Sequence, residues 1–163
     1  ELEGTFPLPE AQLDRFLMRV ALGYPSEEEE NRILLRFRLD DPLVDLAPVT
    51  DPETVTALIR QVREVHVAEP VQNYLVSVIR MTRAHDEIDL GASPRAALAL
   101  YRSAQARAAI RGQDFVLPDD VKFLAPYVLT HRIQISPQTR LRGRRPEDVV
   151  IDLVNTVPVP VEH

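Results

Sequence analysis

The sequence predicts a mainly helical domain of about five to six helices, preceded by a short α/β segment with one strand. Apolar residues recur at intervals of three and four along several stretches after residue 26, which is the spacing of amphipathic helices. Most of these stretches begin with proline, serine or threonine, residues that favour the first positions of a helix. Helices joined by short loops behind a single strand indicate one mostly helical domain.

The first 25 residues are the expected α/β segment. Two prolines and a short helical stretch, FPLPEAQLDRF, precede FLMRVALGYP, in which every second residue from Phe16 to Leu22 is apolar. This alternation predicts a strand at residues 16–22 that is buried on at least one face. A glycine and a proline end the strand, so we place the boundary of this segment between Gly23 and Ser26.

The helical stretches carry start and stop signals. Ser26 with Glu29, and Thr50 with Glu53, have the spacing of capping boxes, and Gly112 suits the end of an alanine-rich helix. We expect helices in the following stretches: 26–39, 50–67, 69–85, 92–112, 118–132 and 146–157. Loops or short extended pieces are expected between them, at 40–50, 114–117, 133–135 and 136–145. The inward face of the alanine-rich helix is predicted to be Ala97, Leu98, Tyr101, Ala104 and Ala108.

Composition narrows the class of protein. The chain has 163 residues, of which 45% are hydrophobic and 27% charged, as in a folded globular protein. Its net charge of −6 disfavours a general nucleic-acid binder, and the absence of cysteine excludes disulfides and thiolate metal sites. The histidines lack metal-ligand spacing, no apolar run approaches the roughly 20 residues of a membrane span, and no signal peptide opens the chain. We therefore expect a cytoplasmic protein with no metal, membrane span or nucleic-acid partner.

The two ends indicate a piece of a longer protein. Residue 1 is Glu, and the residues that follow it read like the interior of a domain, so we expect an excised fragment. Residues 161–163 form a tail, which is either the native end or the start of a purification tag.

Arg95 stands in the first turn of the helix predicted at 92–112. A helix N-terminus carries about half a positive charge and favours acids, so an arginine there breaks a local rule. Ser93 is a good N-cap, and an N-cap followed by an arginine suits a phosphate, which arginine binds with two hydrogen bonds. The alternative is that Arg95 points to solvent or pairs with Glu87 or Asp89. Its repulsion by the helix dipole would then cost only ~0.3–1 kcal/mol.

A second candidate lies just before the predicted strand. Asp14 and Arg15 are flanked by Leu13 and Phe16, and an arginine between apolar anchors is held where it can reach across an interface. The alternative is a surface Asp–Arg pair, which contributes little.

Other charged groups have simpler interpretations. The acids Glu27–Glu30 complement the dipole of their helix and lie in solvent, rather than performing acid–base chemistry. Four arginines (Arg140, Arg142, Arg144 and Arg145) form a basic loop that either is solvated or contacts an acidic partner or polyphosphate. The sequence offers no ordered catalytic triad and no glycine loop to cradle a phosphate.

Two long motifs together resemble one family. EGTFPLPEAQLDRFLMRVALGYPSEEEE resembles the segment that follows the sensor-1 strand in MoxR-type AAA+ ATPases. GASPRAALALYRSAQARAAIRGQDFVLPDDVKFLAPYVLTHRI resembles the helical lid of that family, and VPVP resembles its C-terminus. The resemblance implies that Arg15 is an arginine finger acting on a neighbouring subunit, with Asp14 in support. It implies that Arg95 is the sensor-2 arginine and that Ser93 caps its helix near the phosphates.

The resemblance also implies an organisation. Residues 1–25 would be the C-terminal remnant of the AAA+ α/β core, 26–160 the helical lid bundle and 161–163 the tail. The parent would be a hexameric, chaperone-like ATPase that uses ATP and Mg²⁺ and acts on client proteins, including von Willebrand factor A-domain proteins. Walker A, Walker B and sensor 1 are absent from this chain, so we expect no tight nucleotide binding and no ATP hydrolysis by it alone. The alternative is a freestanding helical interaction module without a nucleotide role.

Overall fold

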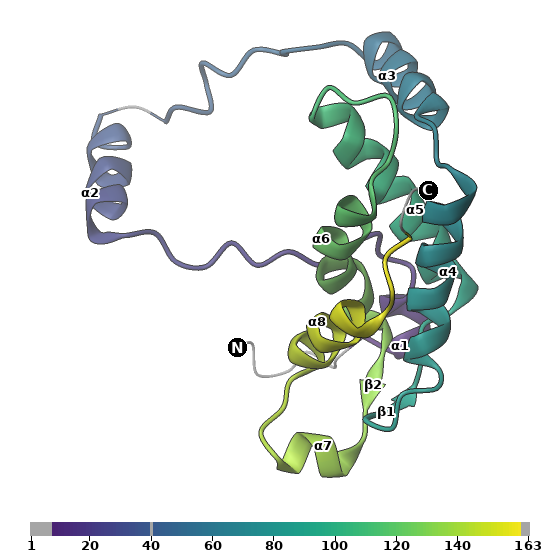
Figure 1. The fold of residues 1–163 in the computed structure, drawn as a ribbon. Coiled ribbons are helices and arrows are strands. Elements are labelled where there is room, and N and C mark those ends of the chain that lie inside the picture. Colours follow the sequence, from purple (N-terminus) through teal and green to yellow (C-terminus); the bar gives the residue numbers. More distant parts are fainter. Residues whose placement is uncertain (1–7, 40, 161–163) are drawn as a thin grey trace. The chain divides into compact units, whose positions relative to one another are not determined.

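The computed structural model describes residues 8–39 and 41–160; the tail predicted at 161–163 lies outside the described residues. The described chain divides into two compact units, drawn in Figure 1. One unit, which we call the helical unit, comprises residues 8–19 and 61–160. The other, which we call the connecting segment, comprises residues 20–60.

The helical unit is built on four helices. They are α4 (Glu69–Thr82), α5 (Pro94–Ile110), α6 (Pro118–Leu129) and α8 (Pro146–Thr156). In Figure 1 these helices gather into one bundle, in which α5 packs on α4 and α6, and α8 packs on α4 and α6. Their inward side chains form one core, whose largest fully buried apolar members are Leu100, Leu129, Leu153, Val78, Val121, Val128, Val149 and Val150. The mainly helical fold class is confirmed.

Smaller elements join these helices. They are α1 (Glu10–Leu13), the 3-10 turn η1 (Thr130–Arg132) and α7 (Pro137–Leu141). A two-stranded antiparallel sheet pairs β1 (Ile88–Leu90) with β2 (Gln134–Ile135), and Ile88 faces Ile135 across it. The sheet holds the chain that leads into α5 next to the chain that leaves η1, and this arrangement positions the site described below.

A buried acid fastens α5 to α6. Asp120 is 0% exposed and accepts hydrogen bonds from Arg107, from Arg111 Nη1 at 3.1 Å and from the backbone N–H of Leu117 at 2.9 Å. The Arg107 guanidinium also lies over the ring of Phe123, 4.1 Å from its centroid. A buried charge is tolerated when it is paired in this way, and these contacts join the end of α5 to the start of α6.

The connecting segment contains helices, but its described residues form no core. It contains α2 (Glu27–Arg36) and the start of α3 (Pro52–Glu64). The predicted capping box of α2 is confirmed, since Ser26 and Glu29 exchange both hydrogen bonds. The predicted capping box at Thr50 is wrong, because Asp51 accepts from the backbone N–H of Thr54 at 2.7 Å instead. None of the described residues between 20 and 60 is buried.

Three further predictions are corrected by the structure. Residues 16–22 form no strand, because no other described segment pairs with their backbone along its length. The basic stretch 136–145 is not all loop, because Ser136 caps α7 by accepting from the backbone N–H of Thr139. The inward face of α5 includes Ala104 and Ala108 as predicted, but Leu98 is 65% exposed and Leu100, which was not predicted, is 0% exposed.

Candidate functional site

The turn before α5 places Ser93 at the start of that helix. Ser93 is the N-cap, as predicted, and its Oγ accepts from the backbone N–H of Ala96 at 3.4 Å. Pro94 occupies the first helical turn, where a missing N–H costs nothing. Arg95 follows in the same turn and is exposed.

The end of α4 holds this turn in place. The buried Thr82 accepts from the backbone N–H of Ala92 at 2.9 Å, and Arg83 Nε donates to the Ala92 carbonyl at 2.8 Å. At Gly91 a Cβ would lie 2.7 Å from the Arg83 Cα and from the Thr82 carbonyl oxygen. The glycine is therefore required by close approach of the two backbones, which fixes the start of α5 against the end of α4.

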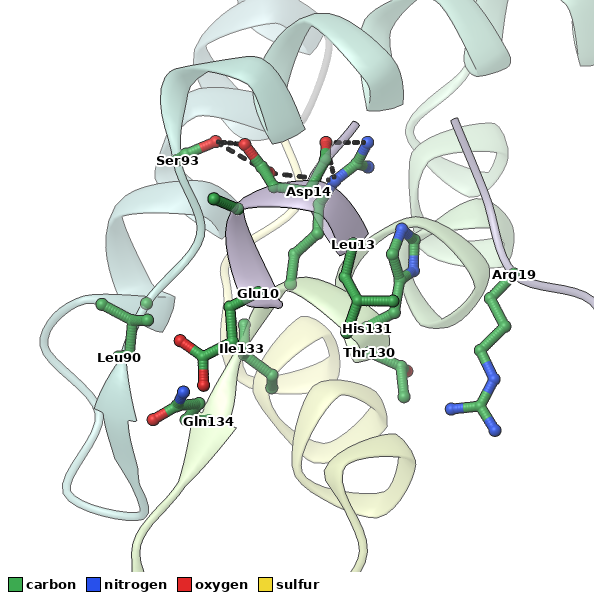
Figure 2. A pocket seen from close by; sticks show the side chains of 13 residues that line it. Glu10, Leu13, Asp14, Arg19, Leu90, Ser93, Thr130, His131, Ile133 and Gln134 are labelled. Carbon is green, nitrogen blue, oxygen red and sulfur yellow. Dashed lines mark hydrogen bonds and ion pairs between the residues drawn. The ribbon is translucent and has the colours of Figure 1, made fainter. Parts of the chain in front are cut away.

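Asp14 connects α5 to the chain that follows α1. Ser93 Oγ lies 3.0 Å from Asp14 Oδ1 and 3.1 Å from Oδ2, and it donates to this carboxylate. Figure 2 shows the Asp14 carboxylate facing Ser93, with Glu10 and Leu13 on α1 beside it. The structure thus brings together two of the four predicted site residues, which are 79 positions apart in the sequence.

Arg132, in η1, completes this contact. Its side chain is 1% exposed, and its Nε lies 3.2 Å from Asp14 Oδ1. It also donates to the backbone carbonyls of Asp14 at 3.1 Å, Leu17 at 3.2 Å, Val128 at 2.9 Å and Phe16. We call Asp14, Ser93 and Arg132 the Asp14 junction.

The sequence analysis did not single out Arg132. The available signal was a single arginine between two apolar runs, YVLT and IQI, where a cation needs partners. Burial lowers the pKa of Arg132 from its ordinary value, the Asp14 carboxylate opposes this effect, and the nearby Arg95 guanidinium adds to it. Arg95 is thus close enough to the Asp14 junction for its charge to act on Arg132.

His131 lies next to the junction. Its Nε2 donates to the Phe16 carbonyl at 3.2 Å, and its buried Nδ1 has no partner among the described residues. Burial lowers the pKa of His131, and the positive charges of Arg132 and Arg19 lower it further. The hydrogen bond to the Phe16 carbonyl and the charge of Asp14 raise this pKa, but by less. The imidazole of His131 therefore stays neutral down to a lower pH than the imidazole of a free histidine.

A hollow of about 540 Å³ lies beside the junction. It is lined by residues of α1, of the turn before α5 and of η1 and β2, including Glu10, Arg19 and His131. Figure 2 shows these side chains around it. Its walls carry both charges, and no group of three or more acids and histidines in the described ranges is placed to hold a metal ion.

Arg15 and Arg95 are not brought into this hollow. Arg15 is exposed beside Gln12 and Phe16, and Arg95 is exposed at the start of α5. Neither guanidinium forms an ion pair with another residue in the described part of the chain. The alternative pairing of Arg95 with Glu87 is not formed, because Glu87 pairs with Arg144 at 3.0 Å.

The other charged candidates are partly structural. Arg144 joins Glu87 to Asp152, at 3.0 and 2.7 Å, and these hydrogen bonds raise its pKa. Arg145 lies 3.5 Å from Glu147. Arg140 and Arg142 remain exposed, and Glu27–Glu30 occupy the first turn of α2 as predicted. No helix within the described ranges is both long enough and apolar enough to cross a membrane.

Comparison with known proteins identifies the relatives of this fold. The AAA lid domain family matches residues 80–153, which contain the turn before α5 and the whole of η1. Over 163 residues the chain is 41% identical to the uncharacterised protein YeaC of Bacillus subtilis, covering 100% of this chain and 51% of YeaC. It is 36% identical to Chaperone MoxR1 of Mycobacterium tuberculosis, covering 98% of this chain and 44% of that protein.

This chain is homologous to the MoxR family of AAA+ ATPases. A crystal structure of a proposed ATPase from Cytophaga hutchinsonii superimposes with a TM-score of 0.90 at 29% identity, covering 99% of this chain and 52% of that one. The chain therefore spans about half the length of the relatives it matches. The AAA lid domain match includes Ser93 and Arg132 of the Asp14 junction, whereas Asp14 itself precedes the matched residues.

Proposed function

We propose that this chain is the lid and arginine-finger part of a MoxR-type ATPase that couples ATP hydrolysis to chaperone-like remodelling or maturation of partner proteins. The observation that carries the proposal is the pair of exposed arginines next to the Asp14 junction. Arg15 directly follows Asp14, and Arg95 is two residues after Ser93. Two guanidinium groups without ion-pair partners in the described ranges are available to phosphate oxygens.

Each arginine has a distinct role in this proposal. Phosphoryl transfer depends on positioning and on neutralising charge, so a guanidinium at the terminal phosphate accelerates it without covalent chemistry. Arg15 acts as an arginine finger on the nucleotide of a neighbouring subunit, with Asp14 fixing the backbone beside it. Arg95 acts as sensor 2 on the nucleotide of its own subunit, where Ser93 caps the helix.

The residues described here fit a phosphate but not its metal ion. Arg95 at a capped helix N-terminus suits an anion, because the backbone N–H groups and the guanidinium act together. The described part of the chain offers no carboxylate cluster for Mg²⁺, and its glycines are too far apart for a phosphate loop. We therefore expect this chain alone to bind nucleotide weakly and not to hydrolyse it.

The remaining assignments follow from the same proposal. Residues 1–25 belong with the AAA+ core and 26–160 with the lid, and the parent assembles in the cytoplasm as a homo-hexamer that acts on client proteins, von Willebrand factor A-domain proteins among them. The exposed apolar side chains of the connecting segment, such as Leu34 at 69% and Leu35 at 67%, would then pack against the remainder of the longer protein.

The test is the ATPase activity of the full-length protein that carries this chain. The gene is first read for an in-frame Walker A pattern, G-x-x-x-x-G-K-[ST], and ATP turnover is then measured for wild type, Arg15→Ala, Arg95→Ala and Arg142→Ala. We expect Arg15→Ala to reduce turnover by about 10³- to 10⁵-fold. Arg142→Ala, an exposed arginine away from the junction, serves as the matched control and retains wild-type turnover.

Mixing subunits tests whether Arg15 acts on its neighbour. Arg15→Ala subunits are combined with subunits whose Walker A lysine is replaced, so that each inactive partner supplies what the other lacks. Recovery of turnover supports a finger acting between subunits. Full activity of Arg15→Ala rings refutes the assignment.

A second candidate is a freestanding helical interaction module, which is favoured by the exposed apolar side chains of residues 20–60. A gene that starts close to residue 1 and encodes no Walker A pattern would support this module and end the ATPase proposal.

A further inference from the structure

We infer that Arg132 is a positioning residue that makes the Arg15 and Arg95 segments move as one body. The inference rests on the proposed function, in which these two arginines serve the nucleotides of two adjacent subunits. Arg132 touches no nucleotide in this scheme. It acts by holding the backbone on which Arg15 is mounted.

The first step of the argument is how Arg132 uses its donors. Nε points to the Asp14 carboxylate at 3.2 Å, Nη2 to the carbonyls of Asp14 at 3.1 Å and of Phe16, and Nη1 to the carbonyl of Leu17 at 3.2 Å. These acceptors lie on both sides of Arg15, at positions 14, 16 and 17. The guanidinium therefore fixes the backbone around Arg15 while leaving the Arg15 side chain exposed.

The second step is that this grip is anchored in the helical bundle. Nη1 also donates to the carbonyl of Val128 at 2.9 Å, and Val128 is a fully buried residue of α6. The segment that carries Arg15 has no strand pairing in the described chain. It is attached to the bundle by Arg132 and by two further hydrogen bonds. His131 donates to the Phe16 carbonyl, and the Arg19 N–H donates to the Tyr127 carbonyl at 2.9 Å.

The third step is the link to Arg95. Ser93 Oγ accepts from the backbone N–H of Ala96 in the first turn of α5 and donates to Asp14. A displacement of that turn, such as phosphate binding at Arg95 would cause, is therefore passed to Asp14 and to the backbone of Arg15. The connection is a contiguous chain of hydrogen bonds with one charged member buried at 1% exposure.

The cost of burying Arg132 supports a role of this kind. Taking a guanidinium out of water is expensive, and an apolar residue at such a position is often at least as stable. Arg132 donates to four backbone carbonyls and one carboxylate, and four of these five acceptors belong to residues 14–17. This distribution fits a group retained to hold a segment in one place.

The first measurement uses the 163-residue chain itself. Amide hydrogen exchange is compared between wild type, Arg132→Gln and Arg144→Gln. Arg144 is the matched control, because it also forms ion pairs between separate parts of the chain, with Glu87 and with Asp152 of α8, but contacts none of residues 14–17. We expect Arg132→Gln to speed exchange at the Phe16 and Arg19 amides, which donate to the Leu13 and Tyr127 carbonyls, while α5 and α6 stay protected. We expect Arg144→Gln to leave exchange at these two amides unchanged. Unchanged exchange in Arg132→Gln overturns the inference.

The second measurement uses the full-length ATPase. We expect Arg132→Gln to lower kcat by about 10- to 100-fold, the range that a misplaced catalytic group produces, while nucleotide Kd changes by less than about twofold. The Hill coefficient for ATP should fall toward unity, because the subunits no longer communicate. Arg132→Lys, which keeps the charge but cannot reach all the carbonyls, should recover part of the loss. If Arg132→Gln does not fold, Asp14→Asn replaces it and should show the same loss of cooperativity.

The outcomes separate the two proposals. A wild-type protein without ATPase activity, or an Arg15→Ala variant with normal turnover, refutes the proposed function, and the inference about coupling falls with it. An active wild type with an inactive Arg15→Ala variant, combined with normal kcat and normal Hill coefficient in Arg132→Gln or Asp14→Asn, refutes the inference alone.

Discussion

The helical unit and the connecting segment both contain well-formed helices, yet among the described residues the buried core lies in the helical unit alone. In α2, Ser26 and Glu29 complete a capping box, and in α5 Ser93 caps the helix in a comparable way. Leu35 on α2 is nevertheless 67% exposed, whereas Leu100 on α5 is 0% exposed. Local signals thus specify a helix in both regions, while burial depends on whether another apolar face lies against it.

The largest expected effect is the contrast between two leucine truncations. Leu100→Ala opens a cavity in the core of the helical unit, where the surrounding side chains relax only in part, so the free energy of unfolding should fall by about 3–5 kcal/mol. Leu35→Ala removes a side chain that is already 67% exposed and should change it by less than about 0.5 kcal/mol. Urea unfolding of the 163-residue chain, followed by circular dichroism, measures both. A large loss in Leu35→Ala would mean that the connecting segment has a core after all.

Two glycines sharpen the same comparison. Gly91→Ala places a Cβ 2.7 Å from backbone atoms of Thr82 and Arg83, so the turn before α5 must shift, at a cost of about 1–3 kcal/mol. Gly23, in the connecting segment, has a φ of +70° with nothing within 4 Å of an added Cβ. Gly23→Ala strains its own backbone by about 1–2 kcal/mol but should leave unfolding of the helical unit unchanged.

Thermal unfolding of both glycine variants, with exchange at the Ala92 amide as a local probe, tests this contrast. The Ala92 amide should exchange faster in Gly91→Ala, because its hydrogen bond to Thr82 lies in the turn that moves. An equal loss of stability in the two variants would contradict the division into two regions.

Sequence reasoning succeeded where the signal was local. The N-cap at Ser93 and the capping box at Ser26 are set by residues within one turn of each other. The prediction of a capping box at Thr50 was wrong because the neighbouring Asp51 is an equally good cap, and its carboxylate accepts from the backbone N–H of Thr54. The predicted face of α5 was right for Ala104 and Ala108 but wrong for Leu98, because an alanine-rich helix has no strongly apolar side, so Leu98 could be exposed and Leu100 buried.

The parts that failed altogether depend on distant partners. The strand at residues 16–22 needs a neighbouring strand, which the described chain does not provide, so its backbone is bonded to Arg132, His131 and Tyr127 instead. The contact of Asp14 with Ser93 joins positions 79 residues apart, and no pattern in one sequence indicates it. Local signals indicated Asp14, Arg15, Ser93 and Arg95, and the family resemblance implied a role for each. The partners of Arg132 lie more than 100 residues away in the sequence, apart from Val128, so its role depends on the folded arrangement.

The smallest expected effect is a pH dependence confined to the helical unit. Burial holds the pKa of His131 below its ordinary value of 6.5, so near and below that pH the unfolded chain binds a proton that the folded chain does not. The contribution of His131 to the free energy of unfolding should therefore be fully retained above about pH 6.5 and decline as the pH falls through the folded pKa of His131.

Two histidine variants test this pH dependence. His131→Gln, whose amide can still donate to the Phe16 carbonyl, should flatten the decline, while His66→Gln at an exposed position should not. Residues 20–60 contain no histidine, so exchange in α2, corrected for intrinsic rates, should keep the same protection from pH 7 to pH 5.5 while protection around η1 weakens. An unchanged slope in His131→Gln would show that another group carries the proton linkage.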